Sequence, residues 1–65
     1  MNEGSSLLDI SETADLLRLK ESTIRSWILK RRIPFVRLGR RVFVRRVDCD
    51  RLIDQSIVAP LQQQS

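Results

Sequence analysis

The lysine and arginine side chains are the candidate functional groups of this sequence, because they can bind polyanions. Twelve of the 65 residues are Lys or Arg and eight are Asp or Glu, which gives a net charge of +4 at pH 7. The charge is unevenly spread: residues 1–17 carry −4, residues 18–46 carry +10 and residues 47–65 carry −2. A middle segment with eleven basic residues and one acid is typical of a nucleic-acid-binding surface. We therefore expect double-stranded DNA as the partner.

Catalysis and metal binding find little support in the residue types. The sequence has no His and a single Cys, Cys49, so neither an intramolecular disulfide nor a Cys/His zinc site can form. Glu12 and Asp15 are neighbouring carboxylates, but they lack a base or metal partner, and we interpret them as part of a solvated helix N-terminus. We expect no enzyme activity, no metal and no cofactor.

Length and composition predict one small soluble domain. Hydrophobic residues make up 42% and charged residues 31%, which is apolar enough for a core and too polar for a membrane span. We expect a flexible N-terminus at residues 1–6, an ordered domain at 7–59 and a disordered tail at 60–65. The N-terminus lacks the basic and apolar regions of a signal peptide, so we expect a cytoplasmic, nucleoid-associated protein without a membrane partner.

The first predicted helix has Ser11 as its N-cap and ends near Arg18. Glu12 and Asp15 then lie in the first turn, where the helix dipole favours acidic side chains. Apolar residues at positions i, i+4 and i+7 predict one buried stripe. They are Ile10, Ala14 and Leu17.

The second predicted helix begins at Glu21, about three residues later, and stops near Arg31. It cannot continue because Pro34 forces Ile33 out of the helical conformation. Its core anchors are Ile24, Trp27 and Ile28. Its opposite face is largely polar and basic and consists of Ser22, Arg25, Ser26, Leu29, Lys30 and Arg32.

A third helix is predicted near the end of the domain. Asp48 and Asp50 lie near its start, and Pro60 excludes helix beyond Ala59. Cys49 is expected to be a small buried hydrophobe. The apolar stripe of this helix consists of Cys49, Leu52 and Ile53.

Residues 35–45 alternate around Gly39, which predicts a β-hairpin. A two-residue loop would pair Val36 with Phe43 and Leu38 with Arg41, and so mix an arginine into the apolar face. A three-residue loop at residues 39–41 would pair aliphatic residues only. Those pairs are Leu38 with Val42 and Val36 with Val44. We expect the three-residue loop because it yields one aliphatic inner face.

This hairpin would be a basic wing, with Arg37 and Arg45 on its outer face and Arg40 and Arg41 at its tip. Two helices joined by a short turn and followed by a wing predict a winged helix-turn-helix. The expected fold is mainly α, with three short helices and a two-stranded β-hairpin.

The predicted DNA contacts lie on the second helix and on the wing. The helix would enter the major groove, and the wing would follow the backbone or the minor groove. The predicted recognition-helix contacts are Ser22, Thr23, Arg25, Ser26 and Lys30. The predicted wing contacts are Arg37, Arg40 and Arg41.

Short motifs relate the sequence to known proteins. They are Ser22-Thr23-Ile24 and Trp27-Ile28 in the second helix, Ile33-Pro34 at its exit, and Leu38-Gly39-Arg40-Arg41 at the wing. With these motifs, residues 7–53 resemble the excisionase and MerR-like winged helix-turn-helix family. The chain departs from the family at three positions. Arg18 stands where the family has a turn Gly, Lys20 where Ser caps the second helix, and Arg31 where Gly is frequent at the helix exit.

The resemblance implies a small DNA-binding protein of a mobile element. Excisionases bend attachment-site DNA and direct an integrase, so the expected partners are DNA, an integrase and further copies of the chain. The alternatives are a small transcription regulator and the targeting head of a phage packaging complex, which would use the basic face on DNA or on an acidic protein. A full MerR-type regulator is not expected, because about a dozen residues without heptads follow Ile53.

Overall fold

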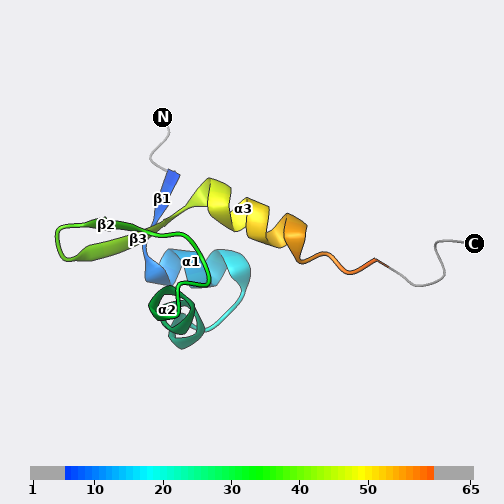
Figure 1. Ribbon diagram of the computed structural model, residues 1–65, viewed down its shortest axis with the longest axis horizontal. Helices are drawn as coiled ribbons and strands as arrows, with labels where there is room; N and C mark the ends of the chain where they lie inside the picture. The colour runs from blue at the N-terminus through cyan, green and yellow to red at the C-terminus, as the bar shows by residue number, and fades with distance from the viewer. Residues whose placement is uncertain (1–5, 60–65) are drawn as a thin grey trace, which may run out of the picture.

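Three helices and a small antiparallel sheet make up the described part of the chain (Figure 1). The structure is a computed structural model that describes residues 6–59. Its fold confirms the expected winged helix-turn-helix. The predicted flexible segments, residues 1–6 and 60–65, lie outside the described residues except for Ser6. The elements in chain order are β1 (Leu7–Leu8), α1 (Ile10–Leu17), α2 (Glu21–Leu29), β2 (Val36–Leu38), β3 (Arg41–Arg45) and α3 (Arg46–Gln55).

The N-cap of α1 is Asp9, so the prediction of Ser11 is wrong and the helix starts two residues earlier. The backbone N–H of Glu12 donates to Oδ1 of Asp9 at 2.8 Å, and the backbone N–H of Asp9 donates to Oε1 of Glu12 at 2.9 Å. This capping box satisfies two backbone donors at once, whereas a serine cap at Ser11 would satisfy one. Glu12 is therefore a capping residue of α1.

The turn between α1 and α2 spans residues 18–20, which confirms the predicted three-residue connection. Lys20 is the N-cap of α2 and makes no side-chain capping hydrogen bond. A Ser at this position would typically contribute ~1 kcal/mol to helix stability. The lysine at this position thus costs the domain a stabilising interaction and adds a positive charge beside α2.

Both helices of the helix-turn-helix are followed by an arginine in the left-handed conformation. Arg18 has φ 59° after α1, and Arg31 has φ 60° after α2. In each case the next backbone N–H donates to the carbonyl five residues back, at 2.9 Å after α1 and 2.8 Å after α2. Glycine is usual in such a helix-ending motif, because a Cβ atom is strained there by roughly 1 kcal/mol.

The sheet has the strand order β1-β3-β2, and β1 was not predicted. Leu7 pairs with Arg45 and Leu8 with Val44, in antiparallel register. A strand of two residues is too short to show alternation, so the sequence carries no periodic signal for it. Its effect is to tie the N-terminal end of the domain to the base of the wing.

The wing has a two-residue loop, so the predicted three-residue loop is wrong. In the pairing of β2 with β3, Val36 lies opposite Phe43 and Leu38 opposite Arg41. Gly39, at φ 62°, is the one loop residue with positive φ, which is the pattern of a type II′ turn that matches strand twist. Figure 1 shows the hairpin extending away from the helices. Because the tip of the wing is exposed from Leu38 to Arg41, turn geometry rather than burial decides its register.

The observed register also changes which wing arginines share a face. Arg37 lies opposite Val42, on the opposite sheet face from Arg45, so the prediction that Arg37 and Arg45 share the outer face is wrong. Arg41 is the first residue of β3 and not a loop residue. Arg40 therefore occupies the wing tip without Arg41.

The core lies where α1, α2, α3 and β3 meet. Ile24 of α2, Val44 of β3 and Cys49 of α3 are fully buried. Trp27 and Ile28, on the same face of α2, are partly buried and pack against the cluster that contains Val44 and Cys49. Burial raises the pKa of the Cys49 thiol, so this residue behaves as a small hydrophobe.

Helix α3 follows β3 without a loop, and Arg45 is both the last strand residue and the N-cap of the helix. The helix ends at Gln55, before the limit that Pro60 sets. Cys49 is buried and Leu52 half-buried, but Ile53 is 44% exposed. The apolar stripe of α3 therefore loses contact with the core toward its C-terminal end.

Candidate nucleic-acid interface

The face of α2 opposite the core is polar, basic and open to solvent. Ser22, Arg25 and Lys30 of the predicted contacts are exposed, whereas Thr23 and Ser26 are half-buried. Successive residues turn by about 100° along a helix, so Ser22, two positions before the buried Ile24, points away from the core. The exposed serine hydroxyl and Arg25 of α2, with Lys30 at its C-cap, are the groups best placed to reach base edges and phosphates.

Arg25 forms an ion pair within α2. Its Nη2 atom lies 3.5 Å from Oε1 of Glu21, one turn earlier, and both side chains are exposed. Pairs of this spacing and orientation contribute ~0.3–0.5 kcal/mol, so DNA can displace Glu21 at little cost. The pair also holds the guanidinium along the outward face of the helix.

The wing carries two exposed arginines near its tip. Arg40 lies in the loop beside Gly39, and the guanidinium carbon of Arg41 lies 5.2 Å from the centroid of the Phe43 ring. Neither arginine forms an ion pair with a carboxylate in the part of the chain that the structure describes. Both positive charges are therefore available to an anionic partner.

Arg37, the third predicted wing contact, belongs to a different cluster. It lines a hollow between the end of α2 and the start of β2, together with Arg31 and Arg32. The structure thus brings Arg40 and Arg41 close together in the chain near the tip, whereas Arg37 lies on the opposite sheet face from Arg41. Arg31 and Arg32 belong to the basic middle segment but were not among the predicted DNA contacts.

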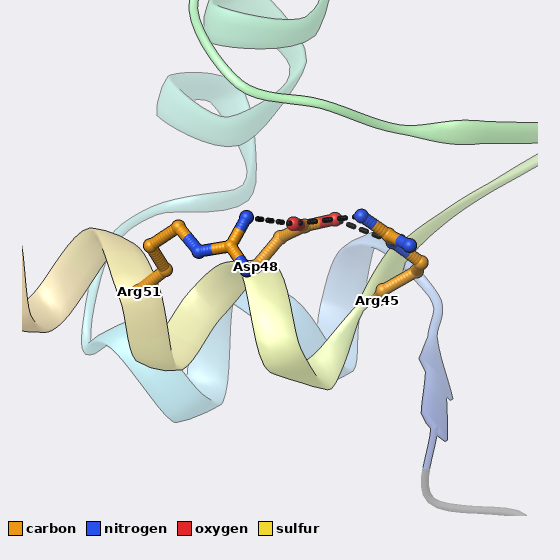
Figure 2. Close-up of polar contacts among 3 residues, drawn as sticks. All are labelled: Arg45, Asp48 and Arg51. Atoms are coloured by element: carbon orange, nitrogen blue, oxygen red, sulfur yellow. Dashed lines mark hydrogen bonds and ion pairs between the residues drawn. The ribbon is translucent and has the colours of Figure 1, made fainter.

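A buried carboxylate fixes the base of the wing (Figure 2). Nε and Nη2 of Arg45 donate to the two carboxylate oxygens of Asp48 at 2.7 and 3.0 Å, and Nη1 of Arg51 lies 3.8 Å from Oδ1. The side chain of Asp48 is 2% exposed. The hydrogen bonds from Arg45 hold the pKa of the Asp48 carboxyl below its usual range, despite the opposing effect of burial.

This arrangement links the last residue of β3 to the first turn of α3. A bidentate arginine–carboxylate pair fixes both distance and angle, so it restrains the direction in which the wing leaves the core. It also neutralises positive charge at the wing base. The sequence placed Asp48 near a helix start, with Arg45 and Arg51 three residues before and after it, but it did not indicate that Asp48 is buried.

Comparison with protein families gives the decisive observation. A family described as helix-turn-helix domain matches residues 7–56, which is most of the chain. The chain belongs to this helix-turn-helix family. Comparisons with curated proteins and with solved structures give no significant match. Family and fold together support a DNA-binding helix-turn-helix, whose second helix is α2.

Two further observations concern the described residues of this helix-turn-helix domain. Between residues 6 and 59, no group of three or more His, Cys, Asp or Glu side chains gathers in a way that could hold a metal ion. None of the helices in this range has the length and apolar character needed to cross a membrane.

Leu29 is an exposed apolar residue at the end of α2. It is 82% exposed and lies on the same outward face as Ser22 and Arg25. The helical spacing placed it on this face, but its apolar character kept it out of the predicted contacts. Apolar side chains in the major groove contact the methyl group of thymine, so Leu29 is a candidate base contact of this helix-turn-helix domain.

Arg25→Ala is expected to weaken binding to the cognate DNA site by ~1–3 kcal/mol and to flatten sequence preference. The reason is that an arginine on the outward face of α2 can donate two hydrogen bonds to guanine. The measurement is a titration of the variant against cognate and random duplexes at one salt concentration. Equal losses on both duplexes would instead assign Arg25 to a phosphate.

The matched control for this variant is Glu21→Gln. It releases the guanidinium of Arg25 and removes a carboxylate from the surface that faces DNA, so affinity should stay equal or increase on both duplexes. A loss of sequence preference in Glu21→Gln would mean that the ion pair itself orients Arg25 for recognition.

Proposed function

We propose that this helix-turn-helix domain is a sequence-specific DNA-binding protein of the excisionase type. It binds and bends DNA without catalysis and so directs the integrase of a mobile element. The observation that carries the proposal is the pairing of two exposed basic elements, α2 and the wing, in one small domain. The excisionase-like motifs of the second helix and the wing support it, and the site of action is DNA in the cytoplasmic nucleoid.

The binding mode follows from the shapes of the two elements. A helix fits the major groove, where Ser22, Arg25 and Lys30 of α2 meet base edges and phosphates. A narrow hairpin fits the minor groove or follows the backbone beside it, and Arg40 and Arg41 supply the charge for either contact. The wing and α2 thus contact adjacent grooves of the DNA duplex.

Bending and cooperativity follow from the small contact area. Single DNA-binding modules bury about 600–1,000 Å² of protein surface, which supplies limited affinity and specificity. Several copies bound side by side, or one copy beside an integrase, increase the affinity by raising the effective concentration. Wings that enter the minor groove repeatedly along one face of the duplex bend it, and the bend brings distant integrase sites together.

The proposal is tested on the DNA that flanks the gene. We expect several closely spaced sites, cooperative shifts in mobility as protein is added, and a bend whose direction depends on the helical phase of the sites. We also expect excision by the cognate integrase to require this protein. Mobility-shift titration, circular permutation of the bound site and an excision assay in a deletion strain measure these three properties.

Other results would replace the excisionase function with another one. A single isolated site bound without a bend, together with full excision in the deletion strain, would contradict it and favour a small transcription regulator. A chain that binds an acidic protein and no DNA would favour the targeting head of a packaging complex.

A further inference from the structure

The hollow between the end of α2 and the start of β2 is a second basic site. It has a volume of about 560 Å³, and its three arginines are exposed. Its lining consists of Arg31, Arg32, Ile33, Pro34, Phe35 and Arg37. We infer that this hollow, called the arginine cleft below, binds a phosphodiester group of the DNA backbone. The inference rests on the DNA-binding function and names a further contact within it.

The charge of the arginine cleft is unbalanced. Within residues 6–59, no carboxylate forms an ion pair with any of its three arginines. The arginines at the wing base differ, because Arg45 and Arg51 both lie beside the carboxylate of Asp48. Like charges gathered in one hollow repel each other, and an anion that enters removes this repulsion.

An aromatic ring positions one of the three guanidinium groups. The guanidinium carbon of Arg31 lies 5.8 Å from the centroid of the half-buried Phe35 ring. At this distance the ring attracts the cation and favours its position beside Phe35, while the N–H groups stay free to donate. A guanidinium held in this way can bind two oxygens of a phosphate at once.

The backbone conformation of Arg31 makes glycine the less strained residue at this position. Arg31 has φ 60°, a conformation that glycine adopts without strain. Arg18 shares this conformation, so the position of Arg31 in the cleft, and not the strain, distinguishes the two arginines. An arginine here contributes a charge to the cleft that the less strained glycine would not.

The position of the cleft identifies the phosphate. When α2 lies in the major groove and the wing in the adjacent minor groove, the strand that separates the two grooves must pass between them. The arginine cleft lies at this junction, because its residues connect α2 to β2. The ligand is therefore a phosphate of this separating strand, and the contact is independent of base sequence.

The test uses Arg31→Gly, which affects stability and binding in opposite directions. Relief of strain should leave the melting temperature unchanged or raise it by roughly 4 °C. Affinity for a short duplex of mixed sequence should fall roughly tenfold, and the slope of log K against log salt should shrink by about 0.9. Thermal unfolding and salt-dependent titration measure the two effects.

Arg18→Gly is the matched control. It removes the same charge and relieves the same left-handed conformation, but it lies before α2, at the opposite end from the cleft. For Arg18→Gly, the slope of log K against log salt should stay closer to that of the unmodified chain than the slope for Arg31→Gly does. Arg32→Ala changes no strained backbone position. It should reduce the slope of log K against log salt by about as much as Arg31→Gly does.

Three results would overturn the inference, and each has a separate meaning. An unchanged slope and affinity in Arg31→Gly would show that the cleft does not contact phosphate. An equal loss in Arg18→Gly would assign the effect to net charge. An unmodified chain that binds neither flanking nor mixed-sequence DNA would contradict DNA binding itself, whereas absence of a bend would contradict only the excisionase proposal.

Discussion

Trp27→Ala is expected to lower the free energy of unfolding by ~3–5 kcal/mol. Trp27 is the largest side chain that packs against the cluster of Ile33, Val44 and Cys49, so its truncation removes buried contact area and leaves a cavity. Domains have roughly 0.05–0.15 kcal/mol of stability per residue, so the loss is a large part of the total for this chain. Chemical denaturation followed by circular dichroism measures it.

Leu29→Ala is the control for this prediction. Leu29 lies on the same helix but is 82% exposed, so the free energy of unfolding should change by less than about 0.5 kcal/mol. A Trp27→Ala variant that keeps the stability of the unmodified chain but no longer binds DNA would contradict the prediction. Trp27 would then be a DNA contact and not a core anchor.

Replacing Arg40 and Arg41 together with Ala is expected to reduce the salt slope of DNA binding by about 1.8, the value for two phosphate contacts. Affinity should fall on every sequence, since wing contacts to the backbone carry little base information. Both residues are exposed on a hairpin that extends from the helices (Figure 1), so the fold should be unaffected. Salt-dependent titration of the folded double variant measures the change.

The control double variant is Arg46→Ala with Arg51→Ala. It removes the same net charge from α3, where Arg46 lies 3.8 Å from Asp50 and Arg51 lies 3.8 Å from Asp48. The slope should change much less, because these cations already face carboxylates. If the wing variant keeps the slope of the unmodified chain, Arg40 and Arg41 serve solubility and not DNA binding.

Several elements of the fold depend on neighbours in the chain, and these were predictable. Pro34 limits α2, and the three-residue turn of residues 18–20 follows from the spacing of two apolar stripes. The α1 cap depends on neighbours as well, since Asp9 and Glu12 have the spacing of a capping box. The prediction of Ser11 as the N-cap was wrong because it gave no weight to this capping-box spacing.

The wing register was mispredicted for a different reason. The prediction assumed that burial of an aliphatic face would outweigh turn geometry. Burial can decide register only where a strand is covered, and β2 is largely exposed, with Arg37 and Leu38 open to solvent. The positive φ of Gly39 and the preference for a II′ turn therefore decided the pairing.

The helix-turn-helix, the basic middle segment and the outward face of α2 were predictable from the sequence, because each depends on residues within a few turns of one another. The pairing of β1 with β3, the burial of Asp48 between Arg45 and Arg51, and the arginine cleft became apparent from the three-dimensional fold. The pairing of β1 with β3 joins segments far apart in the chain. The other two features involve residues close in sequence, but the burial of Asp48 and the path of the chain after α2 depend on how the elements pack around the core, which local propensity does not encode.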